Sequence, residues 1–460
     1  MRDAMAFSTQ CVDEKAMNQP VLICSLLSRH FGADALEDLV VLRFQFPYWM
    51  RPDVLRAIDR VLADGPEPRF VCARMRGSSL EFRFSDLIEE GKKGIVVGPP
   101  VYDEVNIGEQ VPVRCPQRAL WLQVRSEAPL AVLMDSDSGY RRTRIQIEVA
   151  ASRGAEHIAR ATLERIREHA QRAESFRGKV LAPAQEEYMF DESPTTLRIA
   201  RVEPVARDHI VLPPGLLELV ERNTIGFANR CDTLVRLGMS GQKGVLLYGP
   251  PGTGKTFLVR YLSGALKGYT TFLLPGDKVG WLADTIEAAR MLSPSLVVIE
   301  DVDLIAAHRD GPFQVAPAGL NRLLAEMDGA GPEARILFLL TTNRPEVLEP
   351  ALAARPGRVD QAIEIGLPDD PERRKLLRCY LGSLACPDDV IAHASRRAGR
   401  VSPAYIRELA RRAAQTMLER GGEPLSAADF AAAFADLGGA GSKVTARLLG
   451  AEGFGFAPQV

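Results

Sequence analysis

The chain has 460 residues, enough for about three domains of ordinary size, so it is too long for a small fold held together by disulfides. Hydrophobic residues make up 46% and charged residues 25%, which is typical of folded globular protein rather than of a disordered chain. The 57 basic and 59 acidic residues give a net charge of -2, so no overall field draws the chain to nucleic acid or to an anionic membrane.

Signals for membrane insertion, secretion and disulfides are all weak. Apolar runs such as those at 21–27 and 296–299 are far shorter than the roughly 20 residues that a membrane-spanning helix needs. The first ten residues lack the apolar stretch of a secretory signal. The seven cysteines, at positions 11, 24, 72, 115, 231, 379 and 386, are never spaced Cys-x-x-Cys, and we interpret them as free buried thiols. We therefore expect a cytoplasmic protein that does not act at a membrane.

The first two hundred residues alternate apolar runs typical of β-strands with helical patterns. Strands are predicted at 39–46, 80–84, 94–97, 119–124 and 144–149, and a helix at 52–62. A longer amphipathic helix is predicted at 155–175. We expect a mixed α+β domain over residues 1–182, with a recruiting or regulatory role, and a connector over 183–207, which contains Ser-Pro and Glu-Pro breaks.

An aromatic strip at 44–49, Phe-Gln-Phe-Pro-Tyr-Trp, begins in the first predicted strand of this domain and continues past its end. It is either a binding surface or, as alternating aromatic residues more often are, a strand that faces a core.

From residue 208 apolar strand patterns alternate with helical ones, as in a doubly wound parallel sheet. Beyond residue 369 the patterns are almost all helical, with helices predicted at 371–383, 403–420 and 427–436. We therefore predict a large α/β nucleotide-binding domain over 208–368 and a small helical domain over 369–450.

A phosphate-binding loop is the clearest motif in the chain. A buried-strand run at 244–248 leads directly into Gly249-Pro250-Pro251-Gly252-Thr253-Gly254-Lys255-Thr256, which fits G-x-x-x-x-G-K-[ST]. The glycines allow backbone N–H groups to face a phosphate, and the helix predicted at 256–265 presents its positive end. Lys255 would reach the β- and γ-phosphates, and Thr256 would bind Mg²⁺. The alternative, a glycine-rich turn without a ligand, is disfavoured by the strand before it and the helix after it.

Acidic residues follow the next buried strand, at 296–299, which continues as Glu300-Asp301-Val302-Asp303. Because neighbouring parallel strands end on the same edge of a sheet, these carboxylates are expected across from the phosphate loop. There they could hold Mg²⁺ and polarise a water molecule. Acids that merely begin a loop are the alternative.

Four ordered segments, at 244–256, 320–329, 341–345 and 351–360, together resemble the AAA ATPases, in the branch that carries the second region of homology. The resemblance covers about residues 208–440. The chain is similar to a stand-alone bacterial-type member of this family, and its N-terminal domain matches no family that we recognise. It implies hydrolysis of ATP with Mg²⁺ by a homo-oligomer, usually a hexameric ring.

The resemblance also implies roles for single residues. Asn343 corresponds to the sensor-1 residue that orients the attacking water, although a turn asparagine is the alternative. Arg355 and Arg358 correspond to arginine fingers that reach the γ-phosphate in a neighbouring subunit, and such fingers require an oligomer. Ile225 and Gly226 lie where the family contacts adenine through its backbone.

One departure from the family, and one feature in keeping with a branch that lacks the sensor-2 arginine, bear on catalysis. The order Glu300-Asp301 inverts the usual Asp-Glu, in which the first acid serves Mg²⁺ and the second polarises the nucleophile. By position, we assign Glu300 to the metal and Asp301 to the water; slow turnover is plausible because the shorter Asp301 must come closer to the water. Ala404 stands at the sensor-2 position; Arg407, one turn later, is either a substitute or, more commonly for such an arginine, part of a solvated face.

The leading functional hypothesis is a ring that couples ATP hydrolysis to remodelling or unfolding of a protein recruited by the N-terminal domain. An ATP-regulated assembly switch or scaffold, without threading, is the main alternative. A nucleic-acid remodeller built on the basic run at 140–144 is disfavoured by the neutral net charge and the lack of a nucleic-acid-binding motif.

The segment that would grip a threaded substrate is unusual. Lys278-Val279-Gly280 has lysine where unfoldases of the family have an aromatic residue. Trp281 either replaces that aromatic ring by a shift of register or packs under the following helix. None of the six histidines begins the sequence H-E-x-x-H, so we do not expect the zinc site of the family's proteases.

Overall fold

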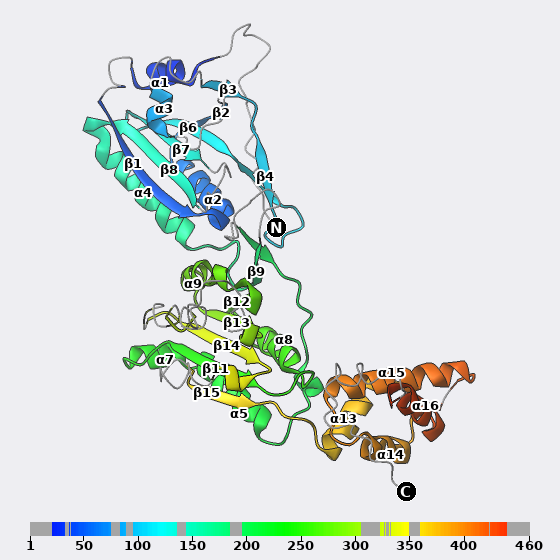
Figure 1. The fold of residues 1–460 in the computed structure, drawn as a ribbon. Coiled ribbons are helices and arrows are strands. Elements are labelled where there is room, and N and C mark those ends of the chain that lie inside the picture. The colour runs from blue at the N-terminus through cyan, green and yellow to red at the C-terminus, as the bar shows by residue number, and fades with distance from the viewer. Residues whose placement is uncertain are drawn as a thin grey trace, which may run out of the picture. The chain divides into compact units, whose positions relative to one another are not determined.

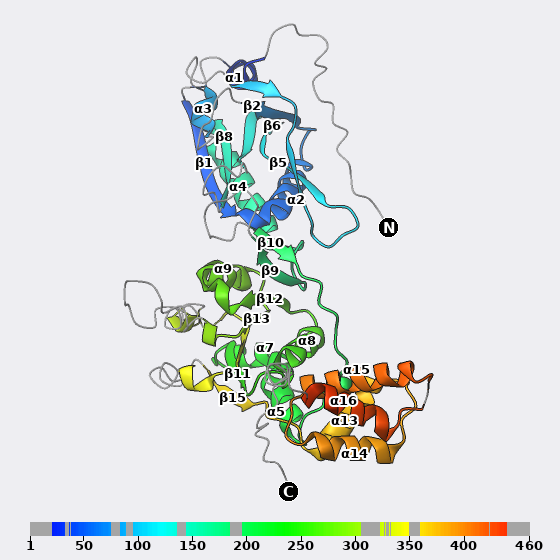
Figure 2. The same cartoon turned by 45° about the vertical axis from the view of Figure 1, so that its right-hand side comes forward.

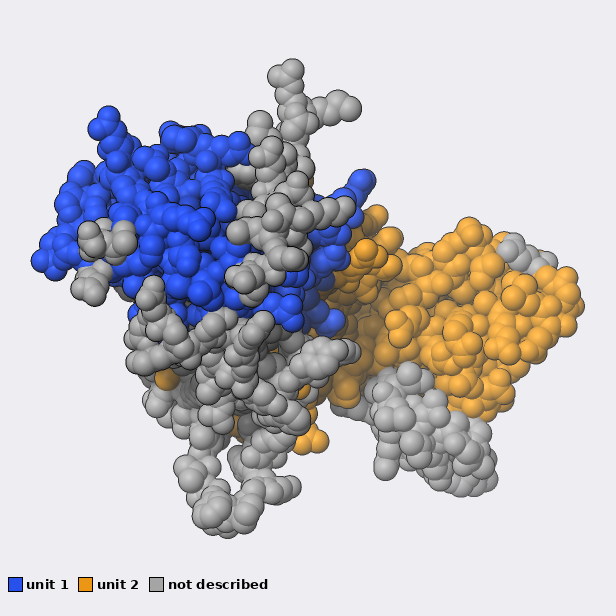
Figure 3. Space-filling view, turned by 90° about the horizontal axis from the view of Figure 1, so that it is seen from above, with its two compact units in different colours: residues 1–177, 181–199 blue, residues 178–180, 200–460 orange. Residues whose placement is uncertain are grey.

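The computed structural model describes residues 21–32, 36, 38–74, 83–88, 95–135, 144–184, 196–304, 323–325, 327, 331, 333–348, 359–422 and 424–438. The chain divides into two compact units, coloured separately in Figure 3. The first consists of residues 1–177 with 181–199, and the second of residues 178–180 with 200–460.

The first unit is built on a six-stranded antiparallel sheet in the order β1-β8-β7-β6-β2-β3 (Figure 1). Its strands are β1 (Leu39–Pro47), β2 (Arg69–Arg74), β3 (Val96–Gly98), β6 (Arg118–Arg125), β7 (Ala128–Asp135) and β8 (Arg144–Ser152). A separate antiparallel pair is formed by β4 (Tyr102–Val105) and β5 (Val113–Pro116). The strands β9 (Val180–Ala184) and β10 (Thr196–Ile199) pair with each other, so the range expected to be a connector contains β-structure.

Helices cover both faces of this six-stranded sheet. They are α1 (Ile23–Phe31), α2 (Arg51–Leu62), α3 (Phe84–Ile88) and α4 (Glu156–Gln171), with 3-10 turns η3 (Tyr48–Met50) and η4 (Arg153–Ala155). The residues Leu120 and Leu122 of β6 share a core with α1 and α3, while the intervening Trp121, on the other face, is also buried. Burial on both faces explains why residues 130–134 of β7 and residues 119–122 of β6 are apolar without interruption.

Most elements predicted for this unit are confirmed, namely the strands at 39–46, 119–124 and 144–149 and the helices at 52–62 and 155–175, within a few residues at their ends. The prediction of a strand at 80–84 is wrong at Phe84, which begins α3; residues 80–82 lie outside the described residues. Phe84 and Leu87 are both buried at a helical spacing, and the backbone N–H of Phe84 donates to the Glu148 carboxylate.

The aromatic strip at 44–49 contributes to the core through Phe46, Tyr48 and Trp49, which are buried. The interpretation as a core-facing strand holds for Phe46 in β1, whereas Tyr48 and Trp49 lie in the turn η3. The described cysteines are free, as predicted, but their burial varies. Cys72, Cys115 and Cys231 are buried, whereas Cys379 is exposed. Burial raises the pKa of the Cys115 thiol to about 12.

The second unit contains a parallel sheet in which the strand order is β12-β13-β14-β11-β15 (Figure 1). These strands are β11 (Gln242–Tyr248), β12 (Thr270–Pro275), β13 (Ser295–Glu300), β14 (Ile336–Thr342) and β15 (Gln361–Glu364). The helices around them are α5 (Leu216–Asn223), α6 (Ile225–Ala228), α7 (Cys231–Arg236), α8 (Lys255–Ala265) and α9 (Leu282–Met291), with 3-10 turns η5 (Arg207–His209) and η6 (Gly276–Trp281). The predicted α/β fold with a parallel sheet is confirmed.

The order of the central strands positions the functional site. Because β14 lies between β13 and β11, the carboxyl ends of all three meet at one edge of the sheet. The phosphate loop follows β11, the acidic residues follow β13, and Asn343 follows β14. This is the edge of an open α/β sheet at which ligands bind.

Among the described residues, four helices follow the sheet and share their own hydrophobic core: α13 (Asp370–Leu381), α14 (Asp388–Ala398), α15 (Pro403–Glu419) and α16 (Ala427–Gly438) (Figure 2). We call this group the lid. The side chain of Asp369 caps α13 in a reciprocal capping box with Glu372, and the Ser402 hydroxyl caps α15 just before Pro403. Three of these helices were predicted; α14 was not. Residues 439–450 of the predicted helical domain lie outside the described residues.

Candidate active site

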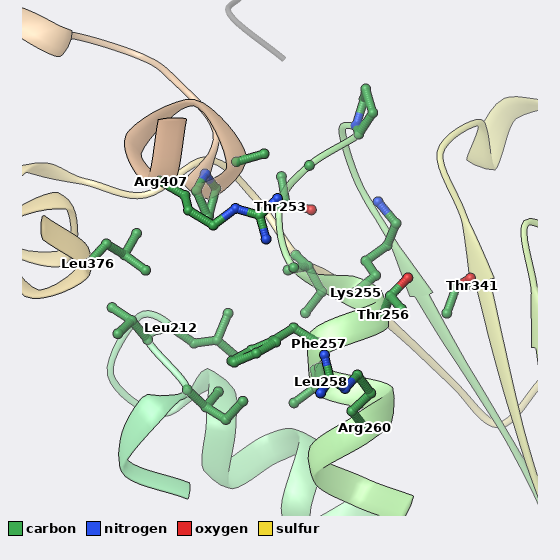
Figure 4. A pocket seen from close by; sticks show the side chains of 18 of the residues that line it. Leu212, Thr253, Lys255, Thr256, Phe257, Leu258, Arg260, Thr341, Leu376 and Arg407 are labelled. Atoms are coloured by element: carbon green, nitrogen blue, oxygen red, sulfur yellow. The ribbon is translucent and has the colours of Figure 1, made fainter. Parts of the chain in front are cut away.

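A cavity of about 410 Å³ lies at the carboxyl edge of the parallel sheet, between the phosphate loop and the lid. Its volume lies in the range of small-ligand sites. Six consecutive residues of the predicted loop and helix line it, from Pro251 to Thr256, and Figure 4 shows Thr253, Lys255 and Thr256 on its wall. Gly249 and Pro250 lie just outside the lining and accept hydrogen bonds from Lys255.

The backbone of the phosphate loop requires glycine at Gly249. Its φ is 144°, in the region that other residues rarely adopt, and a Cβ atom there would lie 2.2 Å from the carbonyl oxygen of Ile365. Gly254, with φ 101°, is the N-cap of α8, so the positive end of this helix opens toward the cavity. The loop has the geometry of an anion site.

Lys255 is buried, with 6% of its surface exposed. Its Nζ donates to the carbonyl oxygens of Gly249 at 2.8 Å and Pro250 at 2.9 Å. Burial lowers the pKa of this amine to about 8, and the nearby carboxylates of Asp301 and Asp303 act in the opposite direction. The two hydrogen-bond partners are neutral carbonyls, so the positive charge remains available to a phosphate.

Asp301 and Asn343 meet at the wall of the cavity. The amide nitrogen Nδ2 of Asn343 donates to Oδ1 of Asp301 at 3.0 Å, and the backbone N–H of Asp301 donates to the hydroxyl of Thr341 at 3.1 Å. All three residues line the cavity. The structure therefore brings together two residues, 42 positions apart, to which the sequence assigned the handling of the attacking water.

The backbone of Asp301 has φ 49°, in the left-handed region. Aspartate is among the few residues other than glycine that are enriched there. The inverted order Glu300-Asp301 thus places at 301 a residue type that suits this conformation.

Glu300 is only partly exposed, and it does not line the cavity. Its Oε1 is buried and has no hydrogen-bond partner among the described residues. A buried carboxylate oxygen without a partner fits an oxygen-coordinated cation such as Mg²⁺, held directly or through water. Thr256 is exposed in the cavity, and a hydroxyl oxygen is a type of ligand that Mg²⁺ accepts.

Ile225 and Gly226 do not lie where they were predicted. They begin the short helix α6; Ile225 packs against the core of the parallel sheet, and neither residue lines the cavity. The segment from His209 to Leu212 lines it instead. Its signal in the sequence is the apolar run Ile210-Val211-Leu212 before two prolines, and the prediction missed it because such a run resembles an ordinary strand.

The lid contributes residues that the motifs did not identify, including Leu376, Tyr380 and Arg407. Arg407 lines the cavity and extends from α15 toward the phosphate loop, near Thr253 (Figure 4). Arg407 is exposed, as a residue of a solvated face would be, and it also lines the cavity, as a substitute for the sensor-2 residue would. Phe257 of α8, which is 38% exposed, extends toward Leu212 across the cavity.

Two other predictions concern residues away from the cavity. Arg355 and Arg358 lie outside the described residues. Trp281 is 7% exposed, which supports its interpretation as a packed side chain rather than a gripping one. The Nζ of Lys278 lies 5.2 Å from the centre of the Trp281 ring.

Neither a membrane-crossing helix nor a metal cluster was found in the part of the chain that the structure describes. No described helix has both the length and the apolar character needed to cross a bilayer. Within the same residues, no three histidine, cysteine, aspartate or glutamate side chains come together as a group that could hold a metal ion.

Comparison with known proteins gives one family and a set of relatives. Residues 245–367 match the family described as ATPase family associated with various cellular activities (AAA). The chain is 36% identical over 231 residues to the ATP-dependent zinc metalloprotease FtsH 3 of Sphaerobacter thermophilus, a match that covers 47% of each chain. It is 33% identical over 222 residues to the ATP-dependent zinc metalloprotease FtsH of Acidimicrobium ferrooxidans, covering 45% of this chain and 34% of that one. The chain thus spans about half or less of the length of these relatives.

Proposed function

Because residues 245–367 form an AAA ATPase domain, we propose that this protein is an ATP-driven remodeller of other proteins. It acts as a homo-oligomer, expected to be a hexameric ring in the cytoplasm. The N-terminal domain, residues 1–182, recruits the protein substrate, and hydrolysis of ATP drives its rearrangement or unfolding. No nucleic acid or membrane partner is proposed.

The observation that carries the hydrolysis step of this proposal is the contact between Asn343 and Asp301, which line the same cavity as Lys255. A carboxylate at this position can accept a proton from water, and an amide beside it can orient that water toward a γ-phosphate. Lys255 supplies a fixed positive charge to the phosphates.

Mg²⁺ would be held by Thr256 and Glu300, and when bound it neutralises charge on the phosphate oxygens. The buried, unpartnered Oε1 of Glu300 and the exposed hydroxyl of Thr256 support this assignment. Glu300 acts on the ion, and Asp301 acts on the water.

Arg355 and Arg358 are proposed to complete the site of a neighbouring subunit. Each guanidinium would stabilise the charge that develops on the γ-phosphate, which makes turnover depend on assembly. Protease activity, which the names of the relatives state, is not carried over, because the sequence contains no H-E-x-x-H motif.

A second candidate function is an ATP-regulated assembly switch without threading. It is favoured by the segment Gly276–Trp281, in which Trp281 is buried and Lys278 replaces the gripping aromatic residue. In that case nucleotide binding, rather than hydrolysis, would set the state of the complex.

An experiment that captures a protein partner and then tests whether ATP hydrolysis releases it distinguishes the two functions. An Asp301→Asn variant loaded with ATP is used to capture protein partners, and each identified partner is then mixed with the unmodified protein. A remodeller changes or releases the partner with ATP but not with a non-hydrolysable analogue. If the analogue acts as well as ATP, the assembly switch replaces our proposal.

A further inference from the structure

Asp303 lies just beyond the end of β13, and its contacts fix a neighbouring turn. Its Oδ1 accepts a hydrogen bond from the hydroxyl of Thr342 at 2.7 Å and one from the backbone N–H of Asn343 at 3.4 Å. Thr342 is fully buried, and its hydroxyl oxygen also accepts from the N–H of Arg344 at 3.0 Å. The carboxylate and the hydroxyl together fix the backbone that leaves β14.

Asn343 is the side chain that this turn carries into the cavity. Its amide nitrogen donates to Oδ1 of Asp301, so the carbonyl oxygen of the same amide is available to accept from a water. The amide and the Asp301 carboxylate then offer two acceptors to one water molecule, which has two O–H donors. A shift or rotation of the turn would remove one of these two acceptors.

We infer that Asp303, acting through the hydroxyl of Thr342, is a positioning residue that holds Asn343 in the orientation required for hydrolysis of ATP. The inference rests on the proposed function. Asp303 and Thr342 do not line the cavity, whereas Asp301, Thr341 and Asn343 do. Their loss should therefore change the rate of hydrolysis and leave nucleotide binding in place.

Thr342 is the better residue to change, because Asp303 has a second effect. The negative charge of Asp303 raises the pKa of Lys255, so any substitution at 303 that removes the charge also alters a phosphate-binding group. Thr342→Val keeps the shape and the β-branched backbone preference but removes the hydroxyl. Thr342→Ser is the matched control, because it keeps the hydroxyl and loses only a methyl group.

The experiment measures kcat and KM for ATP, with thermal melting as a check of folding, in these two variants alone and combined with Asn343→Ala. We expect Thr342→Val to lower kcat by about tenfold or more, since a misplacement of about 1 Å can cost about a hundredfold in rate. KM should stay unchanged, Thr342→Ser should retain kcat, and Thr342→Val should add nothing once Asn343 is alanine. Such non-additivity marks residues that act through one another.

Several results would overturn the inference. They are an unchanged kcat in Thr342→Val, an equal loss in Thr342→Ser, or a loss of the same size with and without Asn343. Should Thr342→Val not fold, Asp303→Asn and Asp303→Ala replace it. Both substitutions remove the charge that acts on Lys255, but asparagine keeps the accepting oxygen, so its kcat should exceed that of alanine; equal kcat in the two would overturn the inference.

Failure of the proposed function has a different signature. It would appear as no turnover in the unmodified protein at any concentration, which removes the inference as well. Turnover that depends on Asn343 but not on Thr342 removes the inference alone.

Discussion

The backbone N–H of Ala404, in the first turn of α15, donates to the carbonyl oxygen of Gly252 in the phosphate loop at 3.2 Å. A Cβ on Gly252 would lie 3.0 Å from the Cβ of Ala404 and 3.0 Å from the hydroxyl oxygen of Ser402. The start of this lid helix therefore sits directly on the loop that would bind phosphate. One turn further along the helix, Arg407 reaches the cavity.

Arg407→Ala is expected to weaken the binding of ATP. The guanidinium lines the cavity, and an exposed charge of this kind contributes up to about 1 kcal/mol, or about fivefold in Kd. Arg411→Ala is the matched control, because Arg411 lies on the same helix and pairs with Glu408. Titration with a fluorescent ATP analogue measures both. Equal affinity for ATP in the two variants would support the interpretation of Arg407 as part of a solvated face.

The pKa of Lys255 predicts a pH dependence of ATP binding. Burial lowers this pKa to about 8, so above pH 8 the amine must take up a proton before it can pair with a phosphate. The affinity for ATP should fall by up to about tenfold per pH unit above this value. Calorimetric titration at pH 8.5, in two buffers with different ionisation enthalpies, should reveal proton uptake that is absent at pH 7.2. Identical binding enthalpies in both buffers at pH 8.5 would contradict this.

The lowered pKa of Lys255 also affects the stability of the fold, which rises with pH where the affinity for ATP falls. The pKa of Lys255 lies at about 8 in the folded protein and near the ordinary 10.5 in the unfolded chain. Between these values the unfolded chain binds more protons, so this group adds stability as the pH rises through that window.

The phosphate loop, the acids after β13 and Asn343 could be predicted from the sequence. Each follows a strongly apolar strand, and parallel order brings such ends to one edge. The contribution of residues 209–212 and of Arg407 to the cavity wall could not be predicted. It depends on how the segment 209–212 and the lid helix α15 pack around the phosphate loop. Strand β7 was missed for a local reason: the turn before it uses Ser126 and Glu127, both at positive φ, in place of the usual glycine or asparagine.

The burial of Trp281 leads to a prediction of stability rather than of substrate grip. Truncation of a buried tryptophan typically costs about 3 kcal/mol or more, so Trp281→Ala should lower the free energy of unfolding by about that amount. Denaturant titration monitored by circular dichroism measures it. Lys278→Ala, at an exposed position in the same segment, is the control and should change it by at most about 1 kcal/mol, because it loses only a cation–π contact with the same ring. A Trp281→Ala protein of undiminished stability would reopen the gripping role.

Catalysis by a neighbouring subunit predicts complementation between two inactive proteins. Lys255→Ala removes a phosphate contact but retains both candidate fingers, and Arg358→Ala does the reverse. Mixed oligomers should regain part of the lost turnover at interfaces that combine an intact pocket with an intact Arg358. Phosphate release is measured after mixing, with light scattering to establish that the assemblies are mixed. Mixed assemblies with no regained activity would count against fingers supplied by a neighbour.

The central claim is that this cavity hydrolyses ATP, with Asp301 acting on the water and Glu300 on the metal ion. Single-turnover phosphate release, measured with the Kd for ATP in Asp301→Asn and Glu300→Gln, tests it most directly. We expect Asp301→Asn to bind ATP normally and to release phosphate about a hundredfold more slowly or worse, as for the loss of a general base. The rate of phosphate release by Glu300→Gln should instead depend on the Mg²⁺ concentration. Normal phosphate release by Asp301→Asn, together with normal ATP binding but no release by Glu300→Gln, would contradict this assignment.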